Sequence, residues 1–291
     1  MLTLTNVNKI YADGTHALNN ISLSLPTGMV GLLGPNGAGK SSLMRTLAGL
    51  QASDAGKIIF DGIDILKNPH DIRKVLGYLP QEFGVYPNMT CYALLKHIAI
   101  LKGLTKPEYT KQIEELLILT NLTNDSGKKV STFSGGMKQR FGIAQALLGD
   151  PKLIIMDEPT AGLDPAERER LNNLLVSISD NKLVLLSTHI VSDIENLCHH
   201  VALVNKGSVI DNGNVQCLIK PLDKKVWSTS ELPNNKDIKN SHVLSKTFRF
   251  GKPTFRIYAQ SKPSPDAHLV EASLQDRYFF ELNKTGELCN I

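Results

Sequence analysis

The segment GPNGAGKS at residues 34–41 constrains the fold more than any other feature of the chain. It matches G-x-x-x-x-G-K-[ST], a glycine-rich loop whose backbone N–H groups surround phosphate oxygens. An apolar run, MVGLL at 29–33, comes before it, and apolar residues with helical spacing follow within 41–50. The sequence therefore predicts a strand, a phosphate-binding loop and a helix whose positive end faces the anion.

This P-loop pattern predicts roles for its own residues. The three glycines let the backbone approach an anion closely, Lys40 reaches the β- and γ-phosphates as a point charge, and the hydroxyl of Ser41 ligates Mg²⁺. The residues expected to bind the nucleotide here are Gly34, Pro35, Asn36, Gly37, Ala38, Gly39, Lys40, Ser41 and Ser42.

Two carboxylates follow a second apolar run in LIIMDEP at 153–159. Asp157 stands where a P-loop ATPase holds Mg²⁺. Glu158 is the next residue, so its side chain points the other way and can act as general base on an attacking water. An acidic pair that caps a turn is the alternative interpretation of these two residues.

Other apolar runs extend this pattern into a fold class. Strands expected at 153–157, 183–187 and 201–204 alternate with helical spacing, which is typical of a mostly parallel α/β core sheet. Period-two alternation at 2–4 and 21–25, with a hairpin signal after Phe60, predicts an antiparallel β layer beside it.

Two further segments complete the expected architecture, a P-loop NTPase of the α/β class. Residues from about 90 to 150 have helical spacing and no strand-like run, which indicates an inserted helical subdomain. Prolines punctuate the chain after about 221, and strand-like runs at 243–250, 255–260 and 278–282 predict a small β-rich C-terminal extension. The expected domains are 1–221 and 222–291.

Composition excludes several classes of protein. The 291 residues are 42% hydrophobic and 21% charged, which is typical of a globular chain. A net charge of +4 is too small to indicate nucleic-acid binding. No apolar run approaches the ~20 residues of a membrane span, and the N-terminal segment does not resemble a signal peptide. The 4 cysteines form no CxxC pair, which fits a reducing compartment.

With these motifs in place, residues 1 to about 220 resemble the nucleotide-binding subunit of ATP-binding-cassette (ABC) transporters. FSGGM at 133–137 resembles the family signature LSGGQ, with Phe133 for Leu and Met137 for Gln. A helix is expected at 136–149, so backbone N–H groups near its start can bind a phosphate. The resemblance implies that this segment contacts the γ-phosphate held by the P-loop of a second subunit, through Ser134, Gly135 and Gly136.

The resemblance implies roles for four more residues. Gln81, in GYLPQ, matches the Q-loop residue that touches Mg²⁺ or the attacking water, and His189, in STH, matches the switch histidine at the γ-phosphate. Tyr11 matches the aromatic residue that stacks on adenine, although a tyrosine at a strand end is often only a packing residue. Asp164, in AGLD, matches the D-loop and also fits a helix N-cap followed by Pro165.

The function implied by the resemblance is an ATP-binding and ATP-hydrolysing subunit that powers a separate membrane permease, with ATP and Mg²⁺ as cofactors. ATP closes a head-to-tail dimer, with a homodimer favoured over a heterodimer, and hydrolysis reopens it. We expect a cytoplasmic protein, peripheral on the inner membrane of a bacterium. SLQDRYFFEL at 273–282 resembles the tail of exporter ATPases, and residues 82–90 are either a docking groove for the permease or a packed hinge.

Two other functions remain open at this point. One is a soluble cassette ATPase that acts on ribosomes or DNA without a permease, although such proteins usually have two cassettes or long coiled coils. The other is a cassette that signals ATP state mechanically to a membrane partner and moves no substrate.

Overall fold

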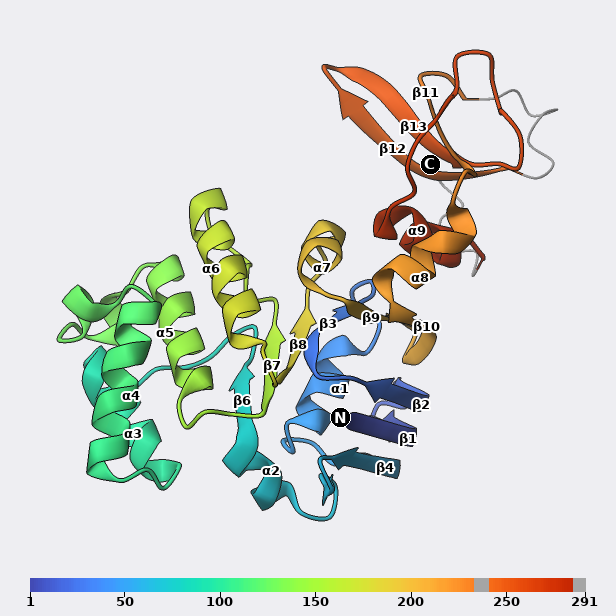
Figure 1. Cartoon of the computed structure of the whole chain (residues 1–291). Coiled ribbons are helices and arrows are strands. Elements are labelled where there is room, and N and C mark those ends of the chain that lie inside the picture. The colour runs from blue at the N-terminus through green and yellow to red at the C-terminus, as the bar shows by residue number, and fades with distance from the viewer. Residues whose placement is uncertain (233–240, 285–291) are drawn as a thin grey trace.

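The centre of the molecule is a six-stranded sheet with the order β10-β9-β3-β8-β7-β6. It is seen in a computed structural model that describes residues 1–232 and 241–284 (Figure 1). Strands β9, β3, β8, β7 and β6 run parallel, and β10 joins β9 antiparallel, so the predicted mostly parallel core is confirmed. The strands are β3 (Gly28–Leu33), β6 (Leu76–Leu79), β7 (Leu153–Asp157), β8 (Leu183–Ser187), β9 (His200–Asn205) and β10 (Ser208–Asn214).

The buried strands are apolar on both faces because each face of the sheet is covered. In β7, Ile154 and Met156 join one hydrophobic core, and Leu153 and Ile155 join the core on the opposite face. Strand β8 divides its side chains in the same way. This two-sided burial explains why these strands read as continuous apolar runs in the sequence.

A second, antiparallel sheet covers one face, as predicted. Its order is β2-β1-β4-β5, and helix α1 (Lys40–Leu47) buries Leu43, Met44 and Leu47 in the core between the sheets. The helix α2 (Pro69–Val75) leads from this sheet to β6. The strands are β1 (Leu2–Ile10), β2 (His16–Leu25), β4 (Ala55–Phe60) and β5 (Ile63–Asp64).

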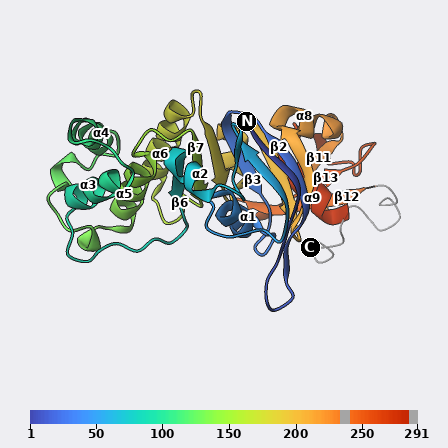
Figure 2. The same ribbon diagram turned by 90° about the horizontal axis from the view of Figure 1, so that it is seen from below.

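Helices follow the chain between 90 and 150, as predicted, and they lie at one end of the central sheet (Figure 2). The α-helices of this segment are α3 (Cys91–Leu101), α4 (Lys106–Leu119) and α5 (Gly135–Leu147). Helices α6 (Pro165–Ile178) and α7 (Val191–Leu197) follow β7 and β8 and pack on the face of the central sheet opposite α1. Short 3₁₀ turns occur at Thr123–Asp125 and Val130–Thr132.

Lys102 ties this helical region to the sheet. It caps the end of α3, and its Nζ donates to the carbonyl oxygens of Leu76 at 3.3 Å and Leu148 at 2.5 Å. Leu76 begins β6, and Leu148 is the C-cap residue directly after α5. Burial lowers the pKa of Lys102 to about 8, because taking the ammonium out of water disfavours its charged form.

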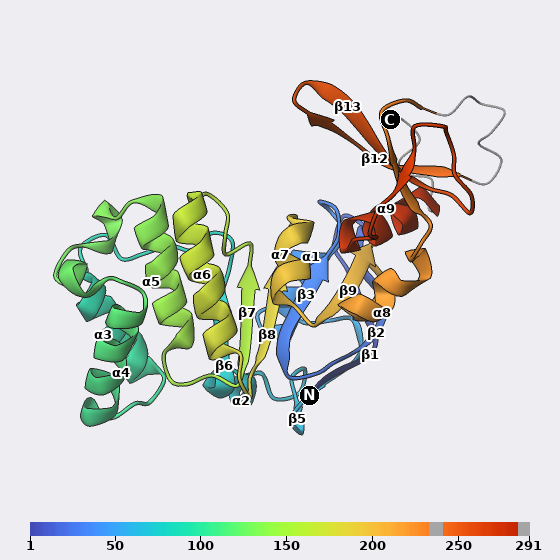
Figure 3. The same cartoon turned by 45° about the horizontal axis from the view of Figure 1, so that its top comes forward.

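The C-terminal part forms a separate sheet with the order β12-β13-β11-β14, and its β12–β13 hairpin extends away from the central sheet (Figure 3). The strand-like runs predicted at 243–250 and 255–260 are β12 and β13. The elements are α8 (Val215–Ile219), a 3₁₀ turn (Lys220–Leu222), β11 (Val226–Thr229), β12 (His242–Arg249), β13 (Lys252–Tyr258), β14 (His268–Leu269) and α9 (Leu274–Lys284).

The strand predicted at 278–282 is wrong, because these residues lie within helix α9. The helix starts with a capping box in which the backbone N–H of Ser273 donates to Asp276 at 2.8 Å and the backbone N–H of Asp276 donates to Ser273 Oγ at 3.3 Å. The aromatic run that suggested a strand packs around the helix, with Phe279 and Phe280 against the core of the C-terminal sheet.

Three cysteines, Cys91, Cys198 and Cys217, are free thiols, and Cys289 lies outside the described residues. A search of the described ranges found no helix that combines the length and the apolar character needed to cross a bilayer.

Candidate nucleotide-binding site

The carboxyl ends of four parallel strands meet at one edge of the central sheet (Figure 1). The loop at 34–41 follows β3, and Gln81 follows β6. Asp157 ends β7, and His189 follows β8 by two residues. Open α/β sheets bind ligands at this edge, so the topology gathers residues that are far apart in the sequence.

Two glycines of the loop are required by close backbone approaches. Gly39 caps α1 with a φ of +97°, and a Cβ there would collide with the carbonyl oxygen of Ala17. A Cβ at Gly34 would collide with the carbonyl oxygen of Val204 in β9. The loop is thus held against β2 and β9 in a conformation that side chains would prevent.

Lys40 lies inside the loop, with only 7% of its surface exposed. Its Nζ donates to the carbonyl oxygens of Gly34 at 2.7 Å and Pro35 at 3.0 Å. Burial lowers the pKa of the Lys40 ammonium, while the negative charges of Glu158 and Asp157 act in the opposite direction. The ammonium is therefore held close to the loop, and both carboxylates act on it.

A cavity of about 760 Å³ lies over the loop. It brings together the predicted residues Tyr11, Gln81, Asp157 and Glu158 with the loop segment 36–42. Gly34 and Pro35 lie beneath it as the acceptors of the Lys40 ammonium. Its volume lies within the usual range of ligand sites, about 300–1,000 Å³.

The Glu158 carboxylate is held at both oxygens. Gln81 Nε2 donates to Oε2 at 3.3 Å, and His189 Nδ1 lies 3.1 Å from Oε1. The Glu158 backbone has a φ of +52°, and its N–H donates to the carbonyl oxygen of Ser187 at 2.9 Å. A left-handed conformation at a residue other than glycine is uncommon and is frequent at functional sites, and here it directs the carboxylate toward Gln81 and His189.

Tyr11 is placed beside the loop by its hydroxyl. The Tyr11 Oη lies 3.0 Å from Ser42 Oγ and donates to Gln51 Oε1 at 2.9 Å. These contacts connect the β1–β2 turn to α1 and fix the ring at the rim of the cavity.

The signature residues lie apart from this cavity. Ser134 caps α5, and its Oγ accepts from the backbone N–H of Met137 at 3.2 Å, while Gly135 is exposed. A Cβ at Gly136 would collide with the carboxylate of Glu167, which pairs with Arg140. Within the described chain, residues 134–136 are not among those that line the cavity.

Asp164 serves as a helix cap in this structure. Its Oδ1 accepts from the backbone N–H of Glu167 at 2.8 Å at the start of α6, where Pro165 follows it. The side chain is exposed, so the capping role leaves one face of the residue open to solvent.

Sequence reasoning missed four lining residues: Thr15, His16, Ala17 and Lys206. Thr15 and His16 follow the Asp13-Gly14 turn signal beside Tyr11, which could have located them. Lys206 occupies the β9–β10 turn, where Gly207 N donates to the carbonyl oxygen of Ala38 at 3.0 Å. No sequence motif connects residue 206 with the loop, so only the fold reveals this contact.

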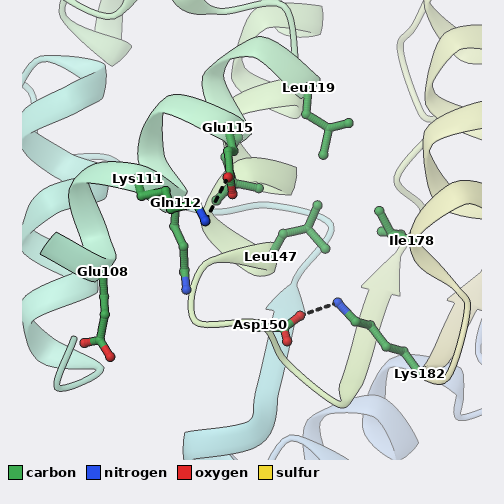
Figure 4. A pocket seen from close by; sticks show the side chains of 10 residues that line it. Glu108, Lys111, Gln112, Glu115, Leu119, Leu147, Asp150, Ile178 and Lys182 are labelled. Carbon is green, nitrogen blue, oxygen red and sulfur yellow. Dashed lines mark hydrogen bonds and ion pairs between the residues drawn. The ribbon is translucent and has the colours of Figure 1, made fainter. Parts of the chain in front are cut away.

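A second cavity, of about 510 Å³, lies along α4 (Figure 4). Four of its charged groups form two ion pairs, Lys182 with Asp150 at 2.6 Å and Lys111 with Glu115 at 3.9 Å, and Leu147 also lines it. The Glu108 carboxylate accepts from Thr105. Because no glycine-rich loop of the described chain lines it, and both of its lysines are already paired with carboxylates, it has no comparable means of binding phosphate.

Comparison with known proteins identifies the family. A family model described as ABC transporter matches residues 18–161. The linearmycin resistance ATP-binding protein LnrL of Bacillus subtilis is 37% identical over 73% of this chain and 69% of its own length. The lantibiotic transport ATP-binding protein SrtF of Streptococcus pyogenes is 38% identical over 72% of this chain and 89% of its own length.

A solved structure agrees with these relatives. The dimeric bacterial ABC transporter cassette MJ0796 superposes with a TM-score of 0.68 at 28% identity, over 74% of this chain and 98% of its own. The same cassette is also known as a dimer in a post-hydrolysis state bound to ADP and Pi. By contrast, this chain matches only 24% of the length of ABC transporter A family member 8 of Dictyostelium discoideum.

The fold and the site define a P-loop ATPase. The chain belongs to the ABC transporter family and is an ATP-binding cassette subunit with ATP hydrolase activity.

Proposed function

We propose that this chain binds Mg²⁺ and ATP over the loop at 34–41, hydrolyses ATP with Glu158 as general base, and powers a separate permease that exports its substrate. The observation that carries the proposal is the Glu158 carboxylate, held by Gln81 and His189 at the cavity over Lys40. A base must be positioned before its protonation state matters, and here both of its oxygens have partners.

ATP binding uses the loop and the rim of the cavity. The backbone of 34–42 and the ammonium of Lys40 bind the phosphates, and the Tyr11 ring stacks on adenine. Thr15, His16 and Lys206 line the same cavity and would lie beside a nucleotide bound there.

The donor set fits Mg²⁺. The Ser41 hydroxyl, the Gln81 amide oxygen and the Asp157 carboxylate all line the cavity. Oxygen donors of this kind are the ligands that Mg²⁺ prefers, and the metal would neutralise charge on the phosphates. Asp157 is 5% exposed, so a cation beside it also compensates a buried carboxylate.

For hydrolysis, Glu158 accepts a proton from the attacking water as it approaches the γ-phosphate in line. Gln81 and His189 keep the carboxylate aimed, and Lys40 and His189 stabilise the charge that develops on the phosphate oxygens.

A second copy of the chain completes the site. Ser134 is the N-cap of α5, and Gly135 and Gly136 are its first residues; the first N–H groups of a helix have no intrahelical acceptor and can bind a phosphate. These three residues are not among those that line the cavity of their own chain. We therefore propose a head-to-tail homodimer in which these residues contact the γ-phosphate of the partner, with Asp164 exposed nearby at the start of α6.

The names of two relatives support export as the direction of transport. LnrL is named for linearmycin resistance and SrtF for lantibiotic transport, and removal of a toxic compound requires export. We propose that the chain works at the cytoplasmic face of a bacterial membrane, where its partner permease contacts residues 82–90. We also propose a division into a nucleotide-binding domain at 1–221, with a helical subdomain at about 90–150, and a C-terminal extension at 222–291.

Mixing two defective chains tests both the site and the dimer. Lys40→Met removes the P-loop ammonium, and Gly135→Asp adds a negative charge at a position where a Cβ meets nothing within 4 Å. Each variant alone is expected to be inactive, and an equal mixture regains about a quarter of the wild-type ATPase rate, because half the dimers hold one intact composite site. An inactive mixture would contradict the composite site, whereas full activity of Gly135→Asp alone would contradict the role of the signature.

A further inference from the structure

Ser187 carries a buried hydroxyl that the proposed mechanism does not use. The residue ends β8 and is 0% exposed. Its Oγ lacks a hydrogen-bond partner anywhere in residues 1–232 and 241–284. A buried hydroxyl is nearly always paired in native proteins, so an unpaired one points to a partner that binds later.

The sheet register places this hydroxyl next to Asp157. The Cα of Ser187 pairs with that of Asp157 in β7, and the parallel register continues one step back with Leu186 and Met156. Paired residues of neighbouring strands direct their side chains to the same face. Ser187 and Asp157 therefore share one face of the sheet.

That face is the one covered by α1. Leu185 and Ile155 stand two residues before Ser187 and Asp157, so their side chains point to the same face. Both belong to the core that also contains Leu43 and Met44 of α1. Asp157 reaches the cavity from this face, and Ser41 reaches it from the first turn of α1. Ser187 thus lies beside Asp157 on this face, between Asp157 of β7 and Leu32 of β3, and it is closed off from solvent.

We propose that Ser187 is a positioning residue for the Mg²⁺ site: its hydroxyl donates a hydrogen bond to the Asp157 carboxylate once that carboxylate faces the metal. The inference rests on the proposed Mg²⁺ binding at Asp157. Groups that hold a metal ligand in place contribute about 10- to 100-fold to metal affinity.

The test compares Mg²⁺ dependence with stability. Three variants are compared, each in a Glu158→Gln background that stops turnover: Ser187→Ala, Ser187→Thr and Asp157→Asn. Binding of a fluorescent ATP analogue is measured at increasing Mg²⁺ concentrations and, separately, in EDTA. We expect Ser187→Ala to raise the Mg²⁺ concentration for half-maximal binding about 10-fold or more, with binding in EDTA unchanged and Ser187→Thr close to the parent. Without nucleotide and metal, Ser187→Ala should melt at the same temperature as the parent or higher, because it removes an unpaired buried hydroxyl.

The outcomes separate this inference from the proposed function. An unchanged Mg²⁺ requirement in Ser187→Ala, with a raised one in Asp157→Asn, would overturn the role of Ser187 and leave the metal site standing. An unchanged requirement in Asp157→Asn as well would overturn the metal site itself. A lowered melting temperature of metal-free Ser187→Ala would show a structural hydroxyl and would also overturn the inference.

Discussion

The His189 imidazole and the Glu158 carboxylate meet at 3.1 Å across the ends of two neighbouring parallel strands. The contact joins residues 31 positions apart in the sequence. It depends on the turn after β7, where the backbone N–H of Glu158 donates to the carbonyl oxygen of Ser187. If Glu158 is the general base, as proposed, its orientation by a neighbouring imidazole is the arrangement expected of catalytic groups that act together.

Glu158→Gln tests the proposed role of Glu158 as general base. The amide keeps the shape of the side chain but cannot accept a proton from water, so ATP hydrolysis should fall about 10²- to 10⁴-fold. Nucleotide affinity should change little, because the loop and Lys40 are intact. Steady-state ATPase assays and titration with a fluorescent nucleotide measure the two effects.

Glu114→Gln is the matched control, since Glu114 is exposed on α4 and should leave both quantities unchanged. Loss of nucleotide binding in Glu158→Gln would contradict the assignment of Glu158 as a base. An ATP-dependent dimer of Glu158→Gln in size-exclusion chromatography is expected, because blocked hydrolysis leaves the ATP-bound form in place.

Gly39→Ala tests the loop geometry. A methyl group at this φ of +97° would strain the backbone and collide with the carbonyl oxygen of Ala17, so we expect nucleotide affinity to fall by 10-fold or more, about 1.4 kcal/mol. Gly62→Ala is the control, because Gly62 also has a positive φ, +85°, but a Cβ there meets nothing within 4 Å. Equal nucleotide affinities in the two variants would show that the Gly39 contact is unimportant.

The sequence predicted those parts of the fold that depend on local pattern. The runs at 153–157 and 183–187 are apolar because both faces of β7 and β8 are covered, so they were visible without a structure. Strand β6 is only four residues long, and its Gly77 and Tyr78 hide the apolar pattern. Helix α9 was missed because aromatic residues dominate 278–282, although Ser273 and Asp276 already form a capping-box sequence.

The residues of the candidate site fall into two groups, those that contiguous motifs predict and those that only the fold brings together. The loop and the acidic pair are contiguous motifs whose chemistry can be read from residue order. Lys206 has no such motif, and the STH motif that begins with Ser187 does not show which strand lies beside it. Both places depend on sheet order, because β9 and β8 flank β3, which leads into the loop. A hydrophobic periodicity shows which segments form strands, but it does not show which strands pair with one another.

Lys102 predicts a pH dependence of stability. Its pKa of about 8 in the folded protein lies below its ordinary value of 10.5, so the folded protein releases this proton at lower pH than the unfolded chain. Between these values the unfolded chain binds more protons, and the free energy of unfolding should rise with pH by up to ~1.4 kcal/mol per unit. Below pH 8 both states are protonated and this contribution is constant.

Lys102→Met isolates this contribution. Methionine keeps the apolar stem but does not titrate. The unfolding free energy of the wild type minus that of the variant should therefore increase from pH 8 to pH 10 in denaturant titrations. Lys152→Met is the control, because Lys152 is exposed and follows Pro151 at the start of β7. A difference that stays constant over this range would show that Lys102 titrates at its ordinary pKa.

Asp276→Asn tests whether the C-terminal extension folds as a unit. Asp276 is 1% exposed, and its carboxylate accepts from Arg256 Nε at 2.7 Å and Nη2 at 2.6 Å. Removing the charge leaves Arg256 uncompensated and weakens the start of α9, so this region should lose about 3 kcal/mol of stability. Trp227 is the 1 tryptophan of the chain and lies in β11, so its fluorescence reports unfolding of this sheet.

The expected result is an earlier Trp227 transition with unchanged nucleotide affinity, because the loop at 34–41 lies in the other proposed domain. Asp223→Asn is the control, since Asp223 is exposed just before β11 and should leave the transition in place. If nucleotide binding is lost together with the Trp227 signal, the extension and the cassette unfold as one cooperative unit, and the boundary at 221 does not separate two domains.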